Sequence, residues 1–517
     1  MAAVTGAHAA LYEQPITIAQ GKVQGAAAFN ASYGSFFPNW KDISVWKGIP
    51  YAASTAGENR WRPPQDPAAW NGTLQATEFG PGCPSSSAAT TSEDCLSVNV
   101  WSPATSADEK LPVMIWSYAA GGTSGMSTYD GGGMATHGVV FVNYNYRTGP
   151  LGWLTLPALA AEDAKNVSGN YGLLDQIRLV HWVRDNIAAF GGDPDRITVS
   201  GQSFGAGATY HTVNSPLTKG LIKGAIAESG IKDPYDPSLW GYGSDYRNMS
   251  WALSFSETYA ESLNATTAAE LRALSVDEVL EGAGVSTFVG FDPVLDGYAI
   301  PNKYIVSLED GAPNDVPILV GNNADEDDVS LTLSLTVDEY IAEVNETYGP
   351  AAAALLELFP AANATQAADA YNDILRAIIR VSTWSFARRW HQTESSPIYQ
   401  YYWTHAPPGQ DSGAFHGSEV PYALNNLYAV TTSDWEADDY AIAHRMSAYW
   451  ANFVKTQNPN EGGSYKNNGS LPYWPANVPA NNVTFEVGKV WETIPVGSPE
   501  LIDLMLEYFY YATPDPM

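Results

Sequence analysis

The sequence predicts an α/β fold with a large, mostly parallel central sheet flanked by helices. Short apolar runs at 112–116 and 139–144 are bounded by glycine-rich turns, as the buried strands of parallel sheets are. The stretch 172–190 places apolar residues at helical spacing and ends at a Gly-Gly pair. A β-branched run at 197–200 follows an Asp-Pro turn and leads into a second glycine-rich turn. Strand, helix and strand therefore alternate along the chain, which is the order of an open α/β sheet.

The length and composition are those of a globular protein with a large core. The chain has 517 residues, of which 45% are hydrophobic and 16% charged. No linker, charge block or internal repeat divides it, so we expect a single domain over residues 1–517. Residues 250–400 are rich in Ala, Glu and Leu and predict a mainly helical insertion, although 316–321 within it is typical of a buried strand.

The charge balance excludes some classes of partner. The chain carries 25 Lys and Arg against 56 Asp and Glu, a net charge of −31. Such a surface repels phosphate backbones and anionic lipid, so nucleic acid is not an expected partner. No run approaches the roughly 18 to 20 apolar residues of a spanning helix, so we expect no membrane span. The sequence leaves the oligomeric state open.

Two cysteines and nine glycosylation sequons indicate an oxidising compartment. Cys83 and Cys95 could be buried thiols, a metal pair or one disulfide, and the intervening Ser- and Thr-rich loop favours the disulfide. We expect a secreted, N-glycosylated protein. The first ten residues lack a basic start and an apolar stretch, so we expect a mature chain with an added initiator Met. The sequons begin at Asn30, Asn71, Asn166, Asn248, Asn264, Asn345, Asn363, Asn468 and Asn482.

A candidate nucleophile lies in the glycine-rich turn at 201–205. Its sequence, Gly-Gln-Ser-Phe-Gly, matches the G-x-S-x-G turn that exposes a serine between a strand and a helix. The β-branched strand before it and the small residues at 205–208 fit that context. A plain glycine-rich turn is the alternative for Ser203. A serine hydroxyl needs a neutral imidazole to remove its proton and a carboxylate to orient the imidazole.

Candidates for these two partners follow the serine in the sequence. His416 lies in a Gly-flanked loop, whereas His444 lies in a helical pattern that favours a structural role. Four consecutive acidic residues at 325–328 follow the predicted strand at 316–321, where open α/β sheets place functional groups. The pattern does not distinguish among these acids, and a solvated loop is the alternative. No His or Cys cluster predicts a metal site.

At these positions the chain resembles the type-B carboxylesterases, the cholinesterase-like and fungal-lipase-like branch of the α/β-hydrolases. The run Glu-Asp-Cys-Leu-Ser-Val-Asn-Val at 93–100 is similar to the family's E-D-C-L-x-L-N-V signature, whose Cys closes a disulfide loop. The resemblance implies an α/β-hydrolase fold and a carboxylic ester hydrolase without metal or organic cofactor. Further matches, in order, are residues 46–52, 60–64, 145–152, 169–176, 186–194 and 449–453.

The resemblance also implies roles for individual residues. Ser203 matches the family nucleophile, His416 the general base and Glu326 the acid. The order Ser, Glu, His is the order of this fold. The family's acid motif, G-x-N-x-D-E-G, has Asp327 in place of its last Gly, which leaves Asp325 and Asp327 as alternatives to Glu326.

The oxyanion loop departs from the family pattern. Two of its three glycines are Ala119 and Ala120, and a positive φ at either would cost energy. We expect the N–H groups of Ala120, Gly121 and Phe204 to form the oxyanion hole, with Gly122 entering if the register shifts by one residue.

The implied substrate is a small-molecule ester. Only eleven residues separate Cys83 from Cys95, and they offer little apolar area for a flap, so we expect soluble short- to medium-acyl or aryl esters. A lipase or sterol-ester hydrolase is the alternative. A non-catalytic adhesion protein of this fold is disfavoured because nucleophile, base and acid are all present. Activity is expected to rise with pH near the ordinary pKa of a histidine side chain, about 6.5.

Overall fold

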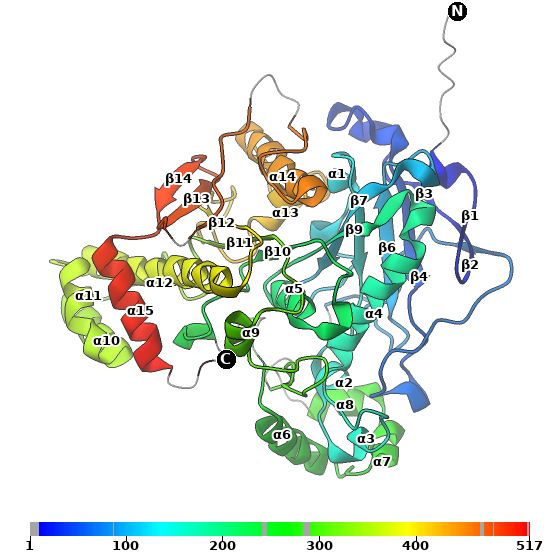
Figure 1. The fold of residues 1–517 in the computed structure, drawn as a ribbon, viewed down its shortest axis with the longest axis horizontal. Helices are drawn as coiled ribbons and strands as arrows, with labels where there is room; N and C mark the ends of the chain where they lie inside the picture. Colours follow the sequence, from blue (N-terminus) through cyan, green and yellow to red (C-terminus); the bar gives the residue numbers. More distant parts are fainter. Residues whose placement is uncertain are drawn as a thin grey trace, which may run out of the picture.

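A mixed eleven-stranded sheet runs through the molecule (Figure 1). The computed structural model describes residues 10–85, 87–239, 246–282, 290–465, 470–478, 480–513 and 516. The strand order is β14-β13-β12-β11-β10-β9-β7-β8-β6-β4-β3. From β8 to β13 neighbouring strands are parallel, and antiparallel strands lie at both edges. The prediction of a mostly parallel sheet is therefore confirmed.

The strands are short except for β9. In chain order they are β3 (Ala26–Ala27), β4 (Ser44–Pro50), β6 (Ser97–Ser102), β7 (Leu111–Ser117), β8 (Val140–Tyr144), β9 (Gly192–Gln202), β10 (Gly224–Glu228), β11 (Ile318–Asn323), β12 (Ile398–Trp403), β13 (Val483–Val487) and β14 (Glu492–Pro495). A separate small sheet contains β1 (Ile16–Ile18), β2 (Gly21–Gln24) and β5 (Thr73–Gln75).

Strand β9 differs from its prediction. The Asp-Pro pair at 193–194 was expected to form a turn before a strand at 197–200, but the strand already begins at Gly192. Leu111 of β7 pairs with Gly192, and the register then shifts before Val113 pairs with Ile197. The proline lies within this irregular part of the pairing, where its lack of an N–H donor costs no regular ladder hydrogen bond.

Helices flank the sheet, with α4 and α5 near β9 and α14 on the other side of the strands in Figure 1. The helices are α1 (Gly132–Ala135), α2 (Gly149–Trp153), α3 (Pro157–Ala160), α4 (Tyr171–Asn186), α5 (Phe204–Asn214), α6 (Met249–Ser262), α7 (Ala268–Ala273), α8 (Val276–Gly282), α9 (Tyr304–Asp310), α10 (Val337–Tyr348), α11 (Ala352–Leu358), α12 (Ala364–Thr393), α13 (Val420–Ala423), α14 (Ala437–Thr456) and α15 (Pro499–Ala512). No helix in the described ranges is both long and apolar enough to cross a bilayer.

The helices of the region 250–400 form two groups, one before β11 in the chain and one after it. Helices α6 to α9 precede the strand, and α10 to α12 follow it. The predicted strand at 316–321 is thus present as β11, shifted by two residues. Helices α10, α11, α12 and α15 share a second hydrophobic cluster apart from the main core around the sheet. Whether the chain folds as one domain stays a prediction.

Candidate active site

Ser203 occupies a sharp turn between β9 and α5. Its φ of 57° and ψ of −124° lie in a region that side-chain-bearing residues rarely adopt. The two glycines of the motif make the turn possible. A Cβ on Gly205 would lie 2.0 Å from the carbonyl oxygen of Ser117, and a Cβ on Gly201 would lie 2.3 Å from that of Gly205. The 201–205 motif therefore forms the strand-to-helix turn that its sequence predicted.

The half-buried ring of His416 and the buried carboxylate of Glu326 form a pair. Nδ1 of His416 is hydrogen-bonded to Oε2 of Glu326. The other oxygen of Glu326 accepts the N–H of Asn323, the last residue of β11, at 2.8 Å. The Glu326 side chain is 1% exposed. Strand β11 thus places the carboxylate at its carboxyl end, and the backbone fixes the orientation in which it meets the ring.

The other acids of the 325–328 run have different surroundings. Asp325 binds Arg376 of α12 at 2.5 Å and accepts the N–H of Ala414 at 2.7 Å. Asp327 and Asp328 are exposed. Glu326 is therefore the acid that meets His416, a distinction that the sequence pattern left open.

The far side of the His416 ring contacts Gln202. Nε2 of His416 lies 3.2 Å from the side-chain nitrogen of Gln202, the residue immediately before Ser203. Gln202 is 3% exposed. The structure thus brings the His416–Glu326 pair beside the serine turn. Sequence analysis missed Gln202, because it occupies a variable position of the motif and only the fold turns its side chain toward the ring.

The electrostatics of the pair favour a charged imidazole. Burial lowers the pKa of His416, but the hydrogen bond and negative charge of Glu326, with the charges of Asp327 and Glu419, outweigh it and raise the pKa to about 9. Burial raises the pKa of Glu326, but His416 outweighs it and the pKa ends below its usual value. The expected pKa near 6.5 for the base is therefore wrong for this site, because a buried carboxylate holds the proton on the ring.

Two further acids, Glu419 and Glu228, are buried near the pair. Asn323 donates its side-chain amide to Glu419, and Trp450 donates to Glu228 at 2.7 Å. Burial raises the pKa of Glu419 to about 7 and the pKa of Glu228 well above its ordinary value. Sequence analysis missed both. Glu228 ends the otherwise apolar strand β10, and an acid in such a position is the signal that could have identified it.

The predicted oxyanion loop is a tight turn after β7. The N–H of Gly122 donates to the carbonyl oxygen of Ala119 at 3.0 Å, and Gly121 has a φ of 71°, the pattern of a type II turn. The residue with the positive φ is therefore Gly121, and neither Ala119 nor Ala120 has to adopt one. Within the described residues the N–H groups of Ala120 and Gly121 have no acceptor, whereas that of Gly122 is engaged.

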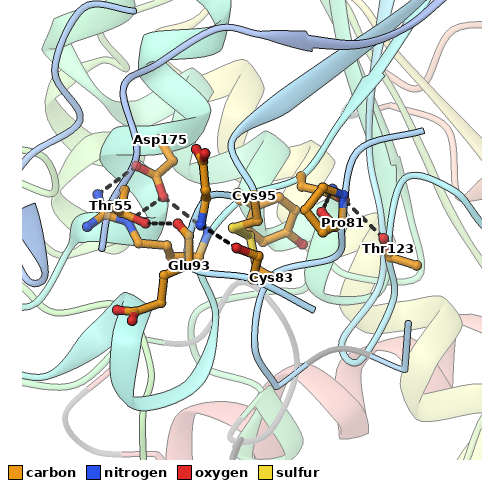
Figure 2. The surroundings of a disulfide bond; sticks show 12 residues. Thr55, Pro81, Cys83, Glu93, Cys95, Thr123 and Asp175 are labelled. Carbon is orange, nitrogen blue, oxygen red and sulfur yellow. Dashed lines mark hydrogen bonds and ion pairs between the residues drawn. A yellow bond between two sulfur atoms is a disulfide. The ribbon is translucent and has the colours of Figure 1, made fainter. Parts of the chain in front are cut away.

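The disulfide loop, whose Cys83–Cys95 bond is drawn in Figure 2, touches this turn. Cys83 and Cys95 are bonded, with their Cα atoms 5.0 Å apart, which confirms the predicted disulfide. Inside the loop, the N–H of Ser87 donates to the carbonyl oxygen of Gly121 at 2.8 Å. Asn145 donates to the carbonyl of Pro81 at 2.9 Å and accepts from Thr123 at 3.1 Å. Hydrogen bonds thus hold the disulfide loop against the oxyanion turn.

The described part of the chain holds no group of three or more His, Cys, Asp or Glu side chains suited to a metal ion. The chemistry that the arrangement can perform is that of an acyl-transferring serine: a half-buried serine with a strained backbone, a carboxylate-held imidazole and backbone N–H groups at a neighbouring turn.

Comparison with known proteins agrees with this chemistry. A family model described as "Carboxylesterase family" matches residues 13–492. The chain is 35% identical to a fumonisin B1 esterase of Sphingopyxis macrogoltabida, over 81% of this chain and 80% of the relative. It is 31% identical to a para-nitrobenzyl esterase of Bacillus subtilis (strain 168), over 86% and 91%.

Solved structures show the same fold. A carboxylesterase of Geobacillus stearothermophilus superposes with a TM-score of 0.77 at 27% identity, over 96% of this chain and 99% of that one. The sequence, the fold and the site therefore agree: the chain is an α/β-hydrolase that belongs to the carboxylesterase family and is a carboxylic ester hydrolase.

Proposed function

We propose that Ser203 is the nucleophile of a two-step acyl transfer on soluble esters. In the first step Oγ of Ser203 attacks the ester carbonyl carbon while Nε2 of His416 takes the hydroxyl proton. His416 then gives that proton to the departing alcohol, which leaves an acyl group on Ser203. In the second step water attacks the acyl carbon and gives a proton to His416. The bond between the acyl carbon and Oγ then breaks, His416 returns the proton to Oγ, and the carboxylic acid leaves.

Glu326 and the oxyanion turn support both steps. Glu326 holds Nδ1 of the ring, so that Nε2 faces the serine turn, and its charge stabilises the imidazolium that forms. The N–H groups of Ala120, Gly121 and Phe204 stabilise the negative oxygen of the tetrahedral intermediates. The engaged N–H of Gly122 supports this assignment over the alternative shifted by one residue.

The observation that carries the proposal is the strained conformation of Ser203 beside the His416–Glu326 pair. Its test is labelling with diethyl p-nitrophenyl phosphate, followed by intact mass and peptide mapping. One adduct on the peptide that contains Ser203 is expected, and none in Ser203→Ala. Ser254→Ala is the control, because Ser254 is an exposed serine of α6. Labelling elsewhere with Ser203 unmodified would refute the proposal.

Aromatic side chains beside the serine support aryl or short acyl groups. The Phe204 ring stacks with Tyr146 at 6.4 Å and meets Trp153 edge-on at 6.0 Å. These flat rings and the short disulfide loop favour compact substrates over long chains. The test is the rate on p-nitrophenyl esters of increasing chain length, against emulsified long-chain esters and against fumonisin B1, the compound in the name of a relative. Much higher rates on emulsions would favour the lipase alternative.

We also propose that the protein is a secreted glycoprotein. In each described sequon the asparagine is exposed: Asn30, Asn71, Asn166, Asn248, Asn264, Asn345, Asn363 and Asn482. Asn468 lies outside the described residues. The chain buries many other asparagines, such as Asn99 and Asn143. Expression in a glycosylating host, followed by glycosidase treatment, is expected to lower the intact mass. An unchanged mass would contradict the proposal.

A further inference from the structure

We propose that this protein has a second ligand site, away from Ser203, that binds an uncharged planar aromatic molecule. The site is a cavity of about 620 Å³, a size typical of pockets for small molecules. Its walls include Phe36, Phe37, Tyr428, Tyr440, His137 and His444. None of the residues of the candidate active site is among the described residues that line it.

The cavity lies at the opposite end of the parallel strands from Ser203. Thr136 and His137 line it and come just before β8, at the amino end of that strand. Ser203 follows β9, at its carboxyl end. Because β8, β7 and β9 are parallel neighbours, the two positions lie at opposite edges of the sheet. A molecule in this cavity is therefore neither the ester under attack nor part of the acyl-enzyme.

Aromatic rings form the apolar part of the cavity. Phe37 meets Tyr428 edge-on at 5.1 Å, and Phe36 lies 5.6 Å from Tyr440. Phe36 is 47% exposed and Tyr440 36% exposed, so two large rings at the cavity remain partly open to water. Exposed apolar side chains gathered at a hollow are typical of a binding site. Rings in this arrangement favour a flat ligand that can stack or meet them edge-on.

Among the described residues, the polar lining of the cavity consists of amide, hydroxyl and imidazole groups. Its polar lining includes Asn39, Thr136 and Asn425, and among the described residues no Asp, Glu, Lys or Arg side chain lines it. In a chain of net charge −31, an uncharged lining favours an uncharged ligand. Burial lowers the pKa of His444, which keeps that ring neutral at neutral pH.

His444 lines this cavity with its ring. Within the part of the chain that the structure describes, its Nδ1 is shielded from solvent and has no hydrogen-bond partner. That atom therefore does not face the open cavity, and a ligand there would meet other parts of the ring. The amides of Asn39 and Asn425 in the lining can pair with a neutral polar group, so the ligand is an aromatic molecule such as a phenol or an aromatic ketone.

The test is isothermal titration of the full chain with 2-naphthol, which is uncharged at pH 7. Saturable binding is expected, and Phe36→Ala/Tyr440→Ala is expected to weaken it about ten-fold or more. His444→Ala, which removes a ring from the lining, is expected to weaken it about three-fold or more. The matched control is Tyr473→Ala/Tyr510→Ala, which removes two rings that are 74% and 70% exposed elsewhere and should leave binding unchanged.

A crystal soaked with 6-bromo-2-naphthol locates the ligand independently of affinity. The anomalous signal of bromine is expected between the α14 side of the cavity and Phe36. Bromine beside Ser203 alone, equal affinity in all variants, or no saturable binding would overturn the proposal and leave a water-filled hollow. Because the cavity shares no described residue with the active site, these outcomes are independent of whether Ser203 is the nucleophile.

Discussion

At the scale of single residues, the mechanism that we propose makes activity depend on the proton of His416. Its pKa, raised to about 9, is above the ordinary value because Glu326 outweighs the effect of burial. The base must be neutral to accept the serine proton, so kcat/KM is expected to rise with pH along a limb well above 6.5. A pH profile on a soluble p-nitrophenyl ester measures this limb, and a profile already flat from pH 6 to 9 would contradict it.

Replacing the acid tests the source of that shift. Glu326→Gln is expected to move the limb to lower pH, because the negative charge is lost, and to lower kcat about 1,000-fold or more, because the imidazolium loses its stabilising partner. Asp327→Asn is the matched control: its exposed carboxylate acts on His416 only through its charge. It should keep most of the activity and shift the limb slightly in the same direction.

Gln202 offers a test of opposite sign. Gln202→Glu places a carboxylate about 3 Å from Nε2 of His416, where the wild-type protein has a neutral amide. The added charge is expected to raise the pKa of the ring and to move the limb to higher pH by about one unit or more. Profiles of the two proteins measured side by side check this. An unmoved limb would mean that the Gln202 contact is absent in solution.

Single residues also show where sequence reasoning reached its limit. The G-x-S-x-G pattern predicted the strand-to-helix turn at Ser203 because strand, glycines and helix are local in the chain. The choice among the four acids at 325–328 was not local. Asp325 forms an ion pair with Arg376, which lies 51 positions away on α12. This pairing becomes evident only when α12 is packed near the end of β11.

At the scale of elements, the disulfide loop and the oxyanion turn act together. Cys83→Ser/Cys95→Ser is expected to lower the free energy of unfolding by about 3 kcal/mol, since a loop of this length is no longer closed. The Ser87–Gly121 hydrogen bond would loosen, so kcat should fall with little change in KM. Steady-state kinetics and denaturant unfolding measure the two effects.

The alternative outcome for this loop is a change in stability alone. If the double variant is destabilised but keeps its kcat, the loop does not position the turn. The salt bridge between Arg60 and Glu93, at 2.6 Å, anchors the loop near Cys95 and remains in the variant. Any loss of kcat therefore reports on the part of the loop around Ser87.

At the scale of the whole molecule, buried acids link stability to pH. Glu419 is fully buried, and its pKa is raised to about 7, above the ordinary value of 4.5. A raised pKa means that the group favours folding fully below pH 4.5 and loses that contribution as pH rises through 7. Glu419→Gln removes this loss. The free energy of unfolding of the variant minus that of wild type should therefore be greater at pH 8 than at pH 4, by on the order of 3 kcal/mol.

Denaturant unfolding at the two pH values checks this, with Glu357→Gln as the control because Glu357 is an exposed acid of α11. Equal differences at both pH values would mean that Glu419 is ionised without cost.

The fold itself was predictable: apolar runs and helical spacing gave the alternating strands and helices. The buried acids were not, because Glu228 and Glu419 meet their partners only once β10 and the His416 loop are packed.

The central claim is that folding makes Ser203 reactive, and the most direct measurement is kcat/KM of Ser203→Ala on p-nitrophenyl acetate. A loss of about 10⁴-fold or more, with an unfolding midpoint close to that of wild type, is the predicted result. Hydrolysis at an undiminished rate would contradict it.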